Sequence, residues 1–311
     1  MKKDTPLIMD TAKSNLLFAT AMLLSSSLSF AAESPLSLSA SVGVEYDDNI
    51  SVSALDTTTG QSDEALVLDF SAGYMAIENE TTELELAYDF YQSKHNSLSD
   101  FDLQIHTLSA FGSKEVNNKD LSLYYSYSMV DVGDDELYDS HSLTPSVALV
   151  LAEGWYNRFS YSYVSKDFKS ASERDAMQNS LAVDNYYFFM DNSAFLSLGA
   201  RIEQEDADDN ELDYQALYLK AAVSIPLHYN SNKVVDFKGK YERYWRDYDN
   251  VTAAIGKKRD DNQSLIGLEF SKAINKDFDL VLSYEYTDTE SNLPSVDAEG
   301  NVIALKVTTD F

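Results

Sequence analysis

The chain has 311 residues, with 52 acidic against 23 basic side chains and a formal net charge of −29. Such an acidic chain repels nucleic-acid phosphates, because binding them requires Lys and Arg contacts. The absence of cysteine excludes disulfides, thiolate metal sites and cysteine nucleophiles, and an aromatic content of 12% argues against a disordered chain.

The N-terminal segment has the features of a secretory signal. Three Lys precede an apolar run over residues 16–24, and small residues follow it up to Ala32. Cleavage is expected after Ala31 or Ala32, so that residues 1–32 form the signal peptide and residues 33–311 one exported domain. The apolar run is too short for a transmembrane helix, and no later run reaches the ~18 apolar residues that a helical span needs.

After the signal, apolar and polar residues alternate with a period of two, which is typical of β-strands. The segments are close to the ~9–11 residues that a tilted strand needs to cross a bilayer, and longer than most strands of soluble proteins. The predicted strands are 36–46, 65–76, 82–93, 101–113, 121–130, 142–151, 155–165, 176–189, 194–204, 214–225, 233–245, 262–273, 278–287 and 301–311.

The connections between these segments alternate in length, with short ones such as 77–81 after even strands and longer acidic ones such as 47–64 after odd strands. This asymmetry is typical of outer-membrane barrels, which have short periplasmic turns and long external loops. Apolar residues such as Leu66 and Phe70 are expected to face lipid, whereas the opposite faces are small or polar. Because an unpaired strand edge in hydrocarbon is costly, the first strand is expected to pair with the last.

Outward aromatic residues are expected to form two girdles at the two membrane interfaces, which favours a membrane barrel over a soluble sandwich. The loop-side girdle comprises Tyr46, Phe101, Tyr127, Tyr163 and Trp245, and the turn-side girdle comprises Tyr74, Phe111, Trp155, Phe189, Phe278 and Phe311. The predicted fold class is therefore all-β: a closed antiparallel up-and-down transmembrane β-barrel of about 14 strands in a Gram-negative outer membrane.

Charged residues on the inward faces are the candidate pore-lining groups. The acids are Asp69, Glu83, Glu85, Asp89 and Asp102, and the bases are Arg158, Arg201, Lys220, Lys238 and Lys240. Opposed acidic and basic walls would produce a transverse field that orients solutes and biases ions. The alternative is that these groups pair with one another and brace the wall. Acids outnumber bases over the inward positions, which favours a weak cation preference.

Other chemistry finds little support in the sequence. Residues 206–211 resemble the start of a calcium loop but lack its glycine and its closing glutamate. The four His residues show no nucleophile–base–orienter spacing. We therefore expect no enzymatic activity, no cofactor and no specific metal site. The acidic external loops are expected to bind divalent cations diffusely, bridging to lipopolysaccharide phosphates.

The last predicted strand ends in Phe311 and resembles the C-terminal strand of bacterial outer-membrane β-barrels, in which the final Phe is part of the signal read by the barrel-assembly machinery. Further short motifs are Tyr241–Tyr244, Arg259-Asp260, Tyr284–Tyr286 and Ser291-Asn292. Together they are similar to the C-terminal barrel of surface lipoprotein assembly modifiers, which is also fourteen-stranded. That resemblance implies a role in moving a surface lipoprotein. No tetratricopeptide-repeat domain, which that family carries ahead of its barrel, is expected here.

Three functions remain open at this point. The first is a porin-like channel that transports small hydrophilic solutes or ions across the outer membrane. The alternative is an export or assembly factor for surface lipoproteins, and the third is a structural or adhesive barrel. A barrel of this size leaves room for water unless a loop folds inward, and the segments 47–64 and 246–261 are the candidates for constricting it.

Overall fold

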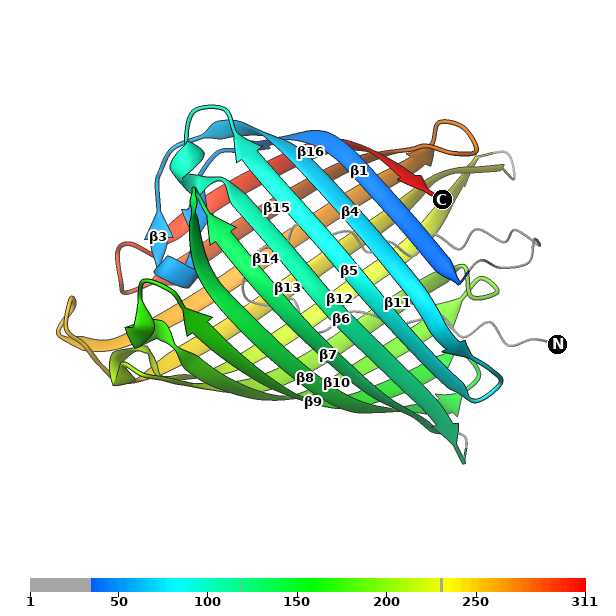
Figure 1. Ribbon diagram of the computed structural model, residues 1–311, viewed down its shortest axis with the longest axis horizontal. Helices are drawn as coiled ribbons and strands as arrows, with labels where there is room; N and C mark the ends of the chain where they lie inside the picture. The colour runs from blue at the N-terminus through cyan, green and yellow to red at the C-terminus, as the bar shows by residue number, and fades with distance from the viewer. Residues whose placement is uncertain (1–34, 118, 230–231) are drawn as a thin grey trace.

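The computed structural model describes residues 35–117, 119–229 and 232–311. Within these ranges, fourteen antiparallel strands form one sheet that closes into a barrel (Figure 1). The predicted all-β, closed, up-and-down fold is thereby confirmed. The predicted signal peptide, residues 1–32, lies outside the described residues. No helix in the described ranges is long and apolar enough to cross a bilayer.

Consecutive barrel strands pair with each other along the whole sheet. The barrel strands are β1 (Leu36–Asp47), β4 (Asp63–Glu78), β5 (Thr82–His95), β6 (Leu103–Val116), β7 (Lys119–Val132), β8 (Asp135–Ala152), β9 (Trp155–Phe168), β10 (Ala176–Phe189), β11 (Ala194–Ala207), β12 (Tyr214–Tyr229), β13 (Asn232–Thr252), β14 (Lys257–Ala273), β15 (Asp279–Ser291) and β16 (Ala298–Asp310). Single-turn 3₁₀ helices η2 (Ser99–Phe101), η3 (Ser172–Arg174) and η4 (Asn210–Leu212) lie in the loops.

The barrel closes where the first strand meets the last, as the sequence predicts. Val42 of β1 lies opposite Val307 of β16 on one side and Leu68 of β4 on the other. The backbone N–H of Phe311 also donates to the Leu38 carbonyl at 2.8 Å. Closure pairs both edges of the sheet, which removes the unpaired backbone groups that hydrocarbon does not tolerate.

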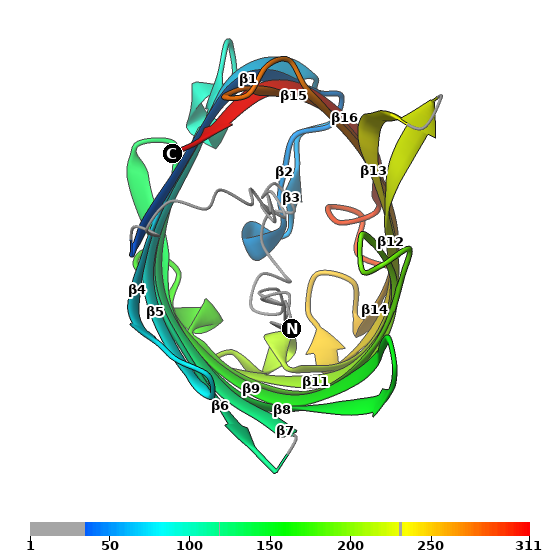
Figure 2. The same ribbon diagram turned by 90° about the vertical axis from the view of Figure 1, so that its right-hand side faces the viewer.

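Both termini of the sheet lie at one end of the barrel, here called the turn end, and the opposite end is called the loop end (Figure 1). The connection between β1 and β4, residues 48–62, leaves the loop end and contains β2 (Ser51–Val52), η1 (Ser53–Leu55) and β3 (Thr57–Thr58). This segment, called the inner loop, lies inside the ring of strands when the barrel is viewed along its axis (Figure 2). It identifies the inner face of the wall, because it contacts that face.

Several strands extend further toward the loop end than the sequence predicts. β13 has 21 residues and continues to Thr252, whereas the predicted strand stops at Trp245. The ladder continues because Arg246 lies opposite Asp261 and Val251 opposite Lys258. The predicted loop 131–141 is likewise wrong: β7 and β8 are joined at a tight turn in which Gly133 has a φ of 65°. The strand ends beyond the apolar band pair through their backbones and need no apolar side chains. The hydropathy pattern therefore does not reveal these extensions.

Candidate functional site

The inner loop crosses the lumen near the loop end and packs its apolar residues against one wall. Val52 belongs to a buried cluster with seven side chains from the inner faces of β4 to β9, and Ala54 and Leu55 pack against the same cluster. Its wall members are Val67, Tyr91, Leu103, Val130, Leu137, Tyr138 and Phe168. The expectation that inward faces are small or polar is therefore wrong at this end of the barrel. Burial of this apolar area holds the loop inside.

The tip of the inner loop is also held by two arginines that bind one carboxylate. Asp56 Oδ2 lies 2.9 Å from Arg174 Nη2, and Asp56 Oδ1 lies 2.8 Å from Arg259 Nη2. Arg174 also donates from Nη1 to the Ala54 carbonyl at 3.0 Å. Arg174 ends η3 between β9 and β10, whereas Arg259 lies on β14, so the loop tip joins distant parts of the wall.

The environment of Asp56 favours its charged form. Burial by itself would raise the pKa of this carboxyl, but the hydrogen bond and charge of Arg259, together with those of Arg174, lower the pKa below its ordinary value. Arg259 is itself fixed, because Asp261 accepts from its Nε at 2.9 and 3.0 Å and Ser291 donates to Asp261 at 2.6 Å. The guanidinium therefore meets Asp56 in a preset orientation.

The base of the inner loop is tied to the last strand. Asn49 Nδ2 donates to the Glu299 carbonyl at 2.6 Å, and its Oδ1 accepts from the hydroxyl of Thr58 at 2.8 Å. Asp48 accepts from the backbone and the side chain of Asn301 at 2.6 and 2.8 Å. The base and the tip of the loop are thus held by separate sets of contacts.

The five predicted basic residues lie on the wall and each forms an ion pair, as the pairing alternative expects. Arg158 Nη2 lies 3.1 Å from Asp184, and Arg201 Nε lies 3.4 Å from Glu203. The lysine pairs are Lys220 with Asp184 at 3.1 Å, Lys238 with Glu269 at 2.9 Å and Lys240 with Glu285 at 2.8 Å. Each base is therefore neutralised by an acid on its own strand or a nearby one, which weakens a basic wall.

Two of these lysine pairs cross an intervening glycine. Lys240 lies opposite Gly267, and Gly267 lies opposite Glu285, so the lysine extends over the glycine to reach the carboxylate. Lys220, Gly199 and Asp184 form a second such row. A Cβ on Gly267 would lie 2.3 Å from Lys240 Cε, and one on Gly199 would lie 2.5 Å from Lys220 Cε. Glycine is required because the lysine lies flat along the wall.

A third lysine lies beside a glycine at the closing seam, but its acid is opposite Ser41 and not opposite that glycine. Lys306 of β16 lies opposite Gly43, and its Nζ reaches Asp69 at 3.0 Å. Asp69 also accepts from the Ser41 hydroxyl at 2.6 Å. The predicted acid Asp69 is therefore paired with a base that the sequence analysis did not select.

The predicted acids of β5 have different surroundings. Asp89 accepts from the Ser71 hydroxyl, and Glu83 accepts from the Ser113 hydroxyl at 3.3 Å. Among the described residues, no Lys or Arg lies within 4.0 Å of the carboxylates of Glu83, Glu85 or Asp89. This strip of β5 is thus a line of inward carboxylates that no base neutralises directly.

Three predicted placements are wrong. Asp102 precedes β6 and caps the 96–102 loop, because its Oδ1 accepts from the His95 backbone N–H at 2.7 Å. Phe101, predicted in the outward girdle, packs against the inner cluster around Val52. Phe111 lies opposite Glu85 and so shares the inner face with it. Asp102 and Phe101 are misplaced because the strand begins at Leu103 rather than at 101. Phe111 is misplaced because its side chain points to the opposite face of the strand from the one predicted.

The strands β11 to β13 carry a stack of arginine and tyrosine side chains that the sequence analysis identified only in part. The guanidinium of Arg246 lies 4.2 Å from the ring centroid of Tyr214 and donates to the Tyr218 hydroxyl at 3.2 Å. Arg201 lies 3.9 Å from the Tyr218 ring. Both tyrosine hydroxyls donate to Glu203 at 3.0 Å. Cation–π contacts and hydrogen bonds of this kind keep the cations against the wall.

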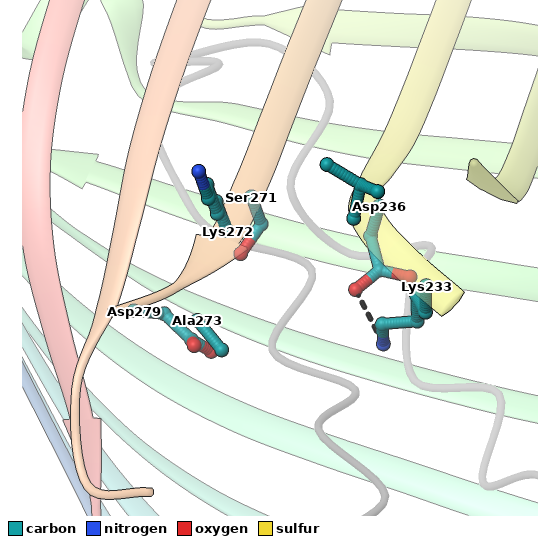
Figure 3. Close-up of a pocket in the computed structure, with 7 residues that line it drawn as sticks. Lys233, Asp236, Ser271, Lys272, Ala273 and Asp279 are labelled. Carbon is teal, nitrogen blue, oxygen red and sulfur yellow. Dashed lines mark ion pairs between the residues drawn. The ribbon is translucent and has the colours of Figure 1, made fainter. Parts of the chain in front are cut away.

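The turn end carries a small open pocket of about 290 Å³ near the start of β13. Figure 3 shows Lys233 and Asp236 facing each other there, with 2.7 Å between Nζ and Oδ2. Ser271, Lys272 and Asp279 complete most of its lining. Its charges are mixed and exposed, so it has no clear ligand chemistry.

The acids that neutralise the inward bases, and the contacts of the inner loop, were missed. Asp184, Glu269 and Glu285 have the same inward parity as the predicted residues, and the cross-strand register identifies them as partners. Asp56 and Arg174 lie in loops, where no periodicity marks them. Among residues 35–117, 119–229 and 232–311, no three His, Asp or Glu side chains converge as metal ligands; the expected lack of a metal, a cofactor and catalysis stays a prediction.

Solved structures of outer-membrane proteins share this fold. OmpT of Vibrio cholerae superposes with a TM-score of 0.52 at 10% identity, over 89% of this chain and 97% of that chain. An anion-selective porin from Comamonas acidovorans gives a TM-score of 0.52 at 9% identity, over 89% and 98%. No protein-family model and no curated protein matches the sequence. At these identities the similarity concerns the fold alone, and function has to be argued from the site.

Proposed function

We infer that the chain forms a porin-like channel for small hydrophilic solutes or ions in a Gram-negative outer membrane. The observation that carries this proposal is the division between the two faces of a closed barrel. Apolar side chains such as Leu66 and Leu305 are 48% and 44% exposed on the outer face, whereas the inner face carries charged and hydroxyl groups. An apolar outer band and a polar interior suit lipid outside and water inside.

The arrangement of charges supports a weak cation preference. Six inward bases are paired with carboxylates: Arg158, Arg201, Lys220, Lys238, Lys240 and Lys306. In the described structure, Glu83, Glu85 and Asp89 face the lumen without a basic partner within ion-pair distance. Carboxylates along one wall attract cations and repel anions. The inner loop narrows the path near the loop end, so conductance is expected to be small for a barrel of this size.

Planar-bilayer recordings test the proposal. The purified chain is expected to give discrete conductance steps with a reversal potential that indicates cation preference. The variant Glu85→Gln removes one lumen charge and is expected to lower the permeability ratio of cation to anion. The matched control Glu290→Gln makes the same chemical change on the exposed outer face of β15 and is expected to leave the ratio unchanged. Silent bilayers with correctly folded protein would contradict the channel, and equal effects of the two variants would contradict the role of β5.

The alternative function, export or assembly of surface lipoproteins as in surface lipoprotein assembly modifiers, rests on the sequence resemblance. No contact in the described part of the chain favours a protein client. Loss of particular lipoproteins from the cell surface in a deletion strain, with normal solute uptake, would favour this alternative over the channel.

The expected partners follow from the same proposal. Phe311 has a side chain that is 77% exposed next to the closing seam, where the barrel-assembly machinery would read it. Outer-membrane lipid and lipopolysaccharide are the proposed surroundings of the outer face. Export through a cleaved N-terminal signal peptide remains part of the proposal.

A further inference from the structure

The inner loop occupies its position through two different kinds of contact. On the wall from β4 to β9, Val52 and Leu55 meet an apolar surface that includes Val67 and Phe168. Next to these apolar contacts, one carboxylate, that of Asp56, meets two guanidinium groups. The tip thus has the chemistry of an apolar group joined to a single carboxylate.

The two arginines and the apolar wall that contact the tip would suit such a ligand even without the loop. In the described residues, the only polar partners of the Arg174 guanidinium are Asp56 and the carbonyl of Ala54, so removal of the tip leaves a cation with no anion beside it. Arg259 stays oriented by Asp261 and keeps one N–H group directed at the vacated position. The apolar wall would be left facing water, which favours any apolar group that covers it.

The tip and the base of the inner loop are anchored separately. Asp56 has a φ of 53° and a ψ of 38°, a left-handed conformation that is uncommon outside Gly, Asn and Asp and that costs a little backbone energy. The ion pairs of Asp56 offset this strain. The base of the loop has its own anchors on β16 through Asn49 and Asp48, so release of the tip does not require detachment of the base.

We propose that the position filled by residues 52–56 is a ligand site for small carboxylates with an apolar tail, and that the inner loop is its internal competitor. Such a ligand would place its carboxylate between Arg174 and Arg259 and its tail on the wall of Val67 and Phe168. Binding of the ligand displaces the tip and opens the loop end of the barrel. The site goes beyond the proposed channel function, because it defines a ligand class and a closed state.

Reactivity of a single cysteine tests the proposal. The chain contains no cysteine, so Val52→Cys introduces a unique thiol that is shielded while the tip is docked. The measurement is its modification rate by a charged methanethiosulfonate, with the full barrel in lipid nanodiscs. Leu55→Cys provides a second reporter if Val52→Cys fails to fold. The probes are hexanoate, acetate, which has the carboxylate alone, and hexanamide, which has the apolar tail without the charge.

Hexanoate is expected to accelerate modification several-fold, and acetate and hexanamide at equal concentration to have little effect. Asp56→Asn keeps the side-chain shape but removes a charge-assisted contact that holds the loop tip in the site. It is expected to raise the basal modification rate about tenfold and to lower the hexanoate concentration that gives half of the maximal acceleration. In Arg174→Gln the rate is expected to be high and insensitive to hexanoate.

Two results would overturn the proposal. If Asp56→Asn raises the rate while hexanoate never does, the contact is a latch without a ligand site. If hexanamide acts as well as hexanoate, no carboxylate is recognised. The rate is measured without current, so a barrel that fails to conduct would contradict the proposed function and leave this inference standing.

Discussion

The glycine on β14 offers a sharp test of how the wall is built. In Gly267→Ala, the new methyl group would lie 2.3 Å from Lys240 Cε and 2.7 Å from its Cγ, well inside normal carbon contact distances of ~3.5–4.0 Å. The Cγ contact cannot be relieved by moving only the end of the side chain. Lys240 must therefore leave the wall, and its 2.8 Å pair with Glu285 is broken.

The expected cost follows from the exposure of this pair. The side chains of Lys240 and Glu285 are 28% and 22% exposed, which places the pair between surface and fully buried ion pairs. Its loss should lower the free energy of unfolding by about 1–3 kcal/mol. The displaced lysine would also project into the lumen, where its charge should reduce the permeability of cations.

Urea unfolding in lipid vesicles measures the effect, with Gly112→Ala as the matched control. A Cβ on Gly112 has no neighbour closer than 3.9 Å, so this change should be neutral or stabilise by about 0.5 kcal/mol. In a Lys240→Ala background, Gly267→Ala should cost nothing further. If the two glycine variants unfold alike in the parent chain, the lysine does not depend on the glycine and the reasoning is wrong.

Two further outcomes follow from the loop and the outer face. The pKa of Asp56 is lowered in the folded state, so its contribution to holding the loop is fully present above its ordinary value of 3.8 and is lost as the pH falls through the lower folded value. Conductance should therefore rise only below about pH 4 and show no such step in Asp56→Asn; a step near neutral pH would contradict this. Leu305→Arg, in the apolar band of β16, should cost about 2–4 kcal/mol in the unfolding free energy in vesicles, whereas Glu290→Arg beyond that band should cost close to zero. Equal costs would argue against lipid facing.

Much of the barrel follows from local pattern. Strands such as 176–189 and 82–93 were predicted at or near their true limits. Successive side chains of a spanning strand point alternately to lipid and to the lumen, so apolar and polar residues alternate along the sequence. The predicted strand limits are wrong above the apolar band, where no lipid contact requires alternation. There β13 continues through Arg246 and Tyr248, and the sequence of this part resembles a polar loop. Alternation along each strand predicted which bases face inward. Their acidic partners depend on the cross-strand register, which is set only when the sheet closes.

By itself, the sequence determined the strand count, the closure of the first strand on the last, and which face of most strands points outward. Those properties depend on a period of two and on the requirement that every backbone group be paired. Only the tertiary structure decided that residues 48–62 fold into the lumen and that Asp56 meets Arg174 and Arg259 there. Contacts between residues separated by more than a hundred positions depend on the shape of the closed barrel, and no local pattern records them.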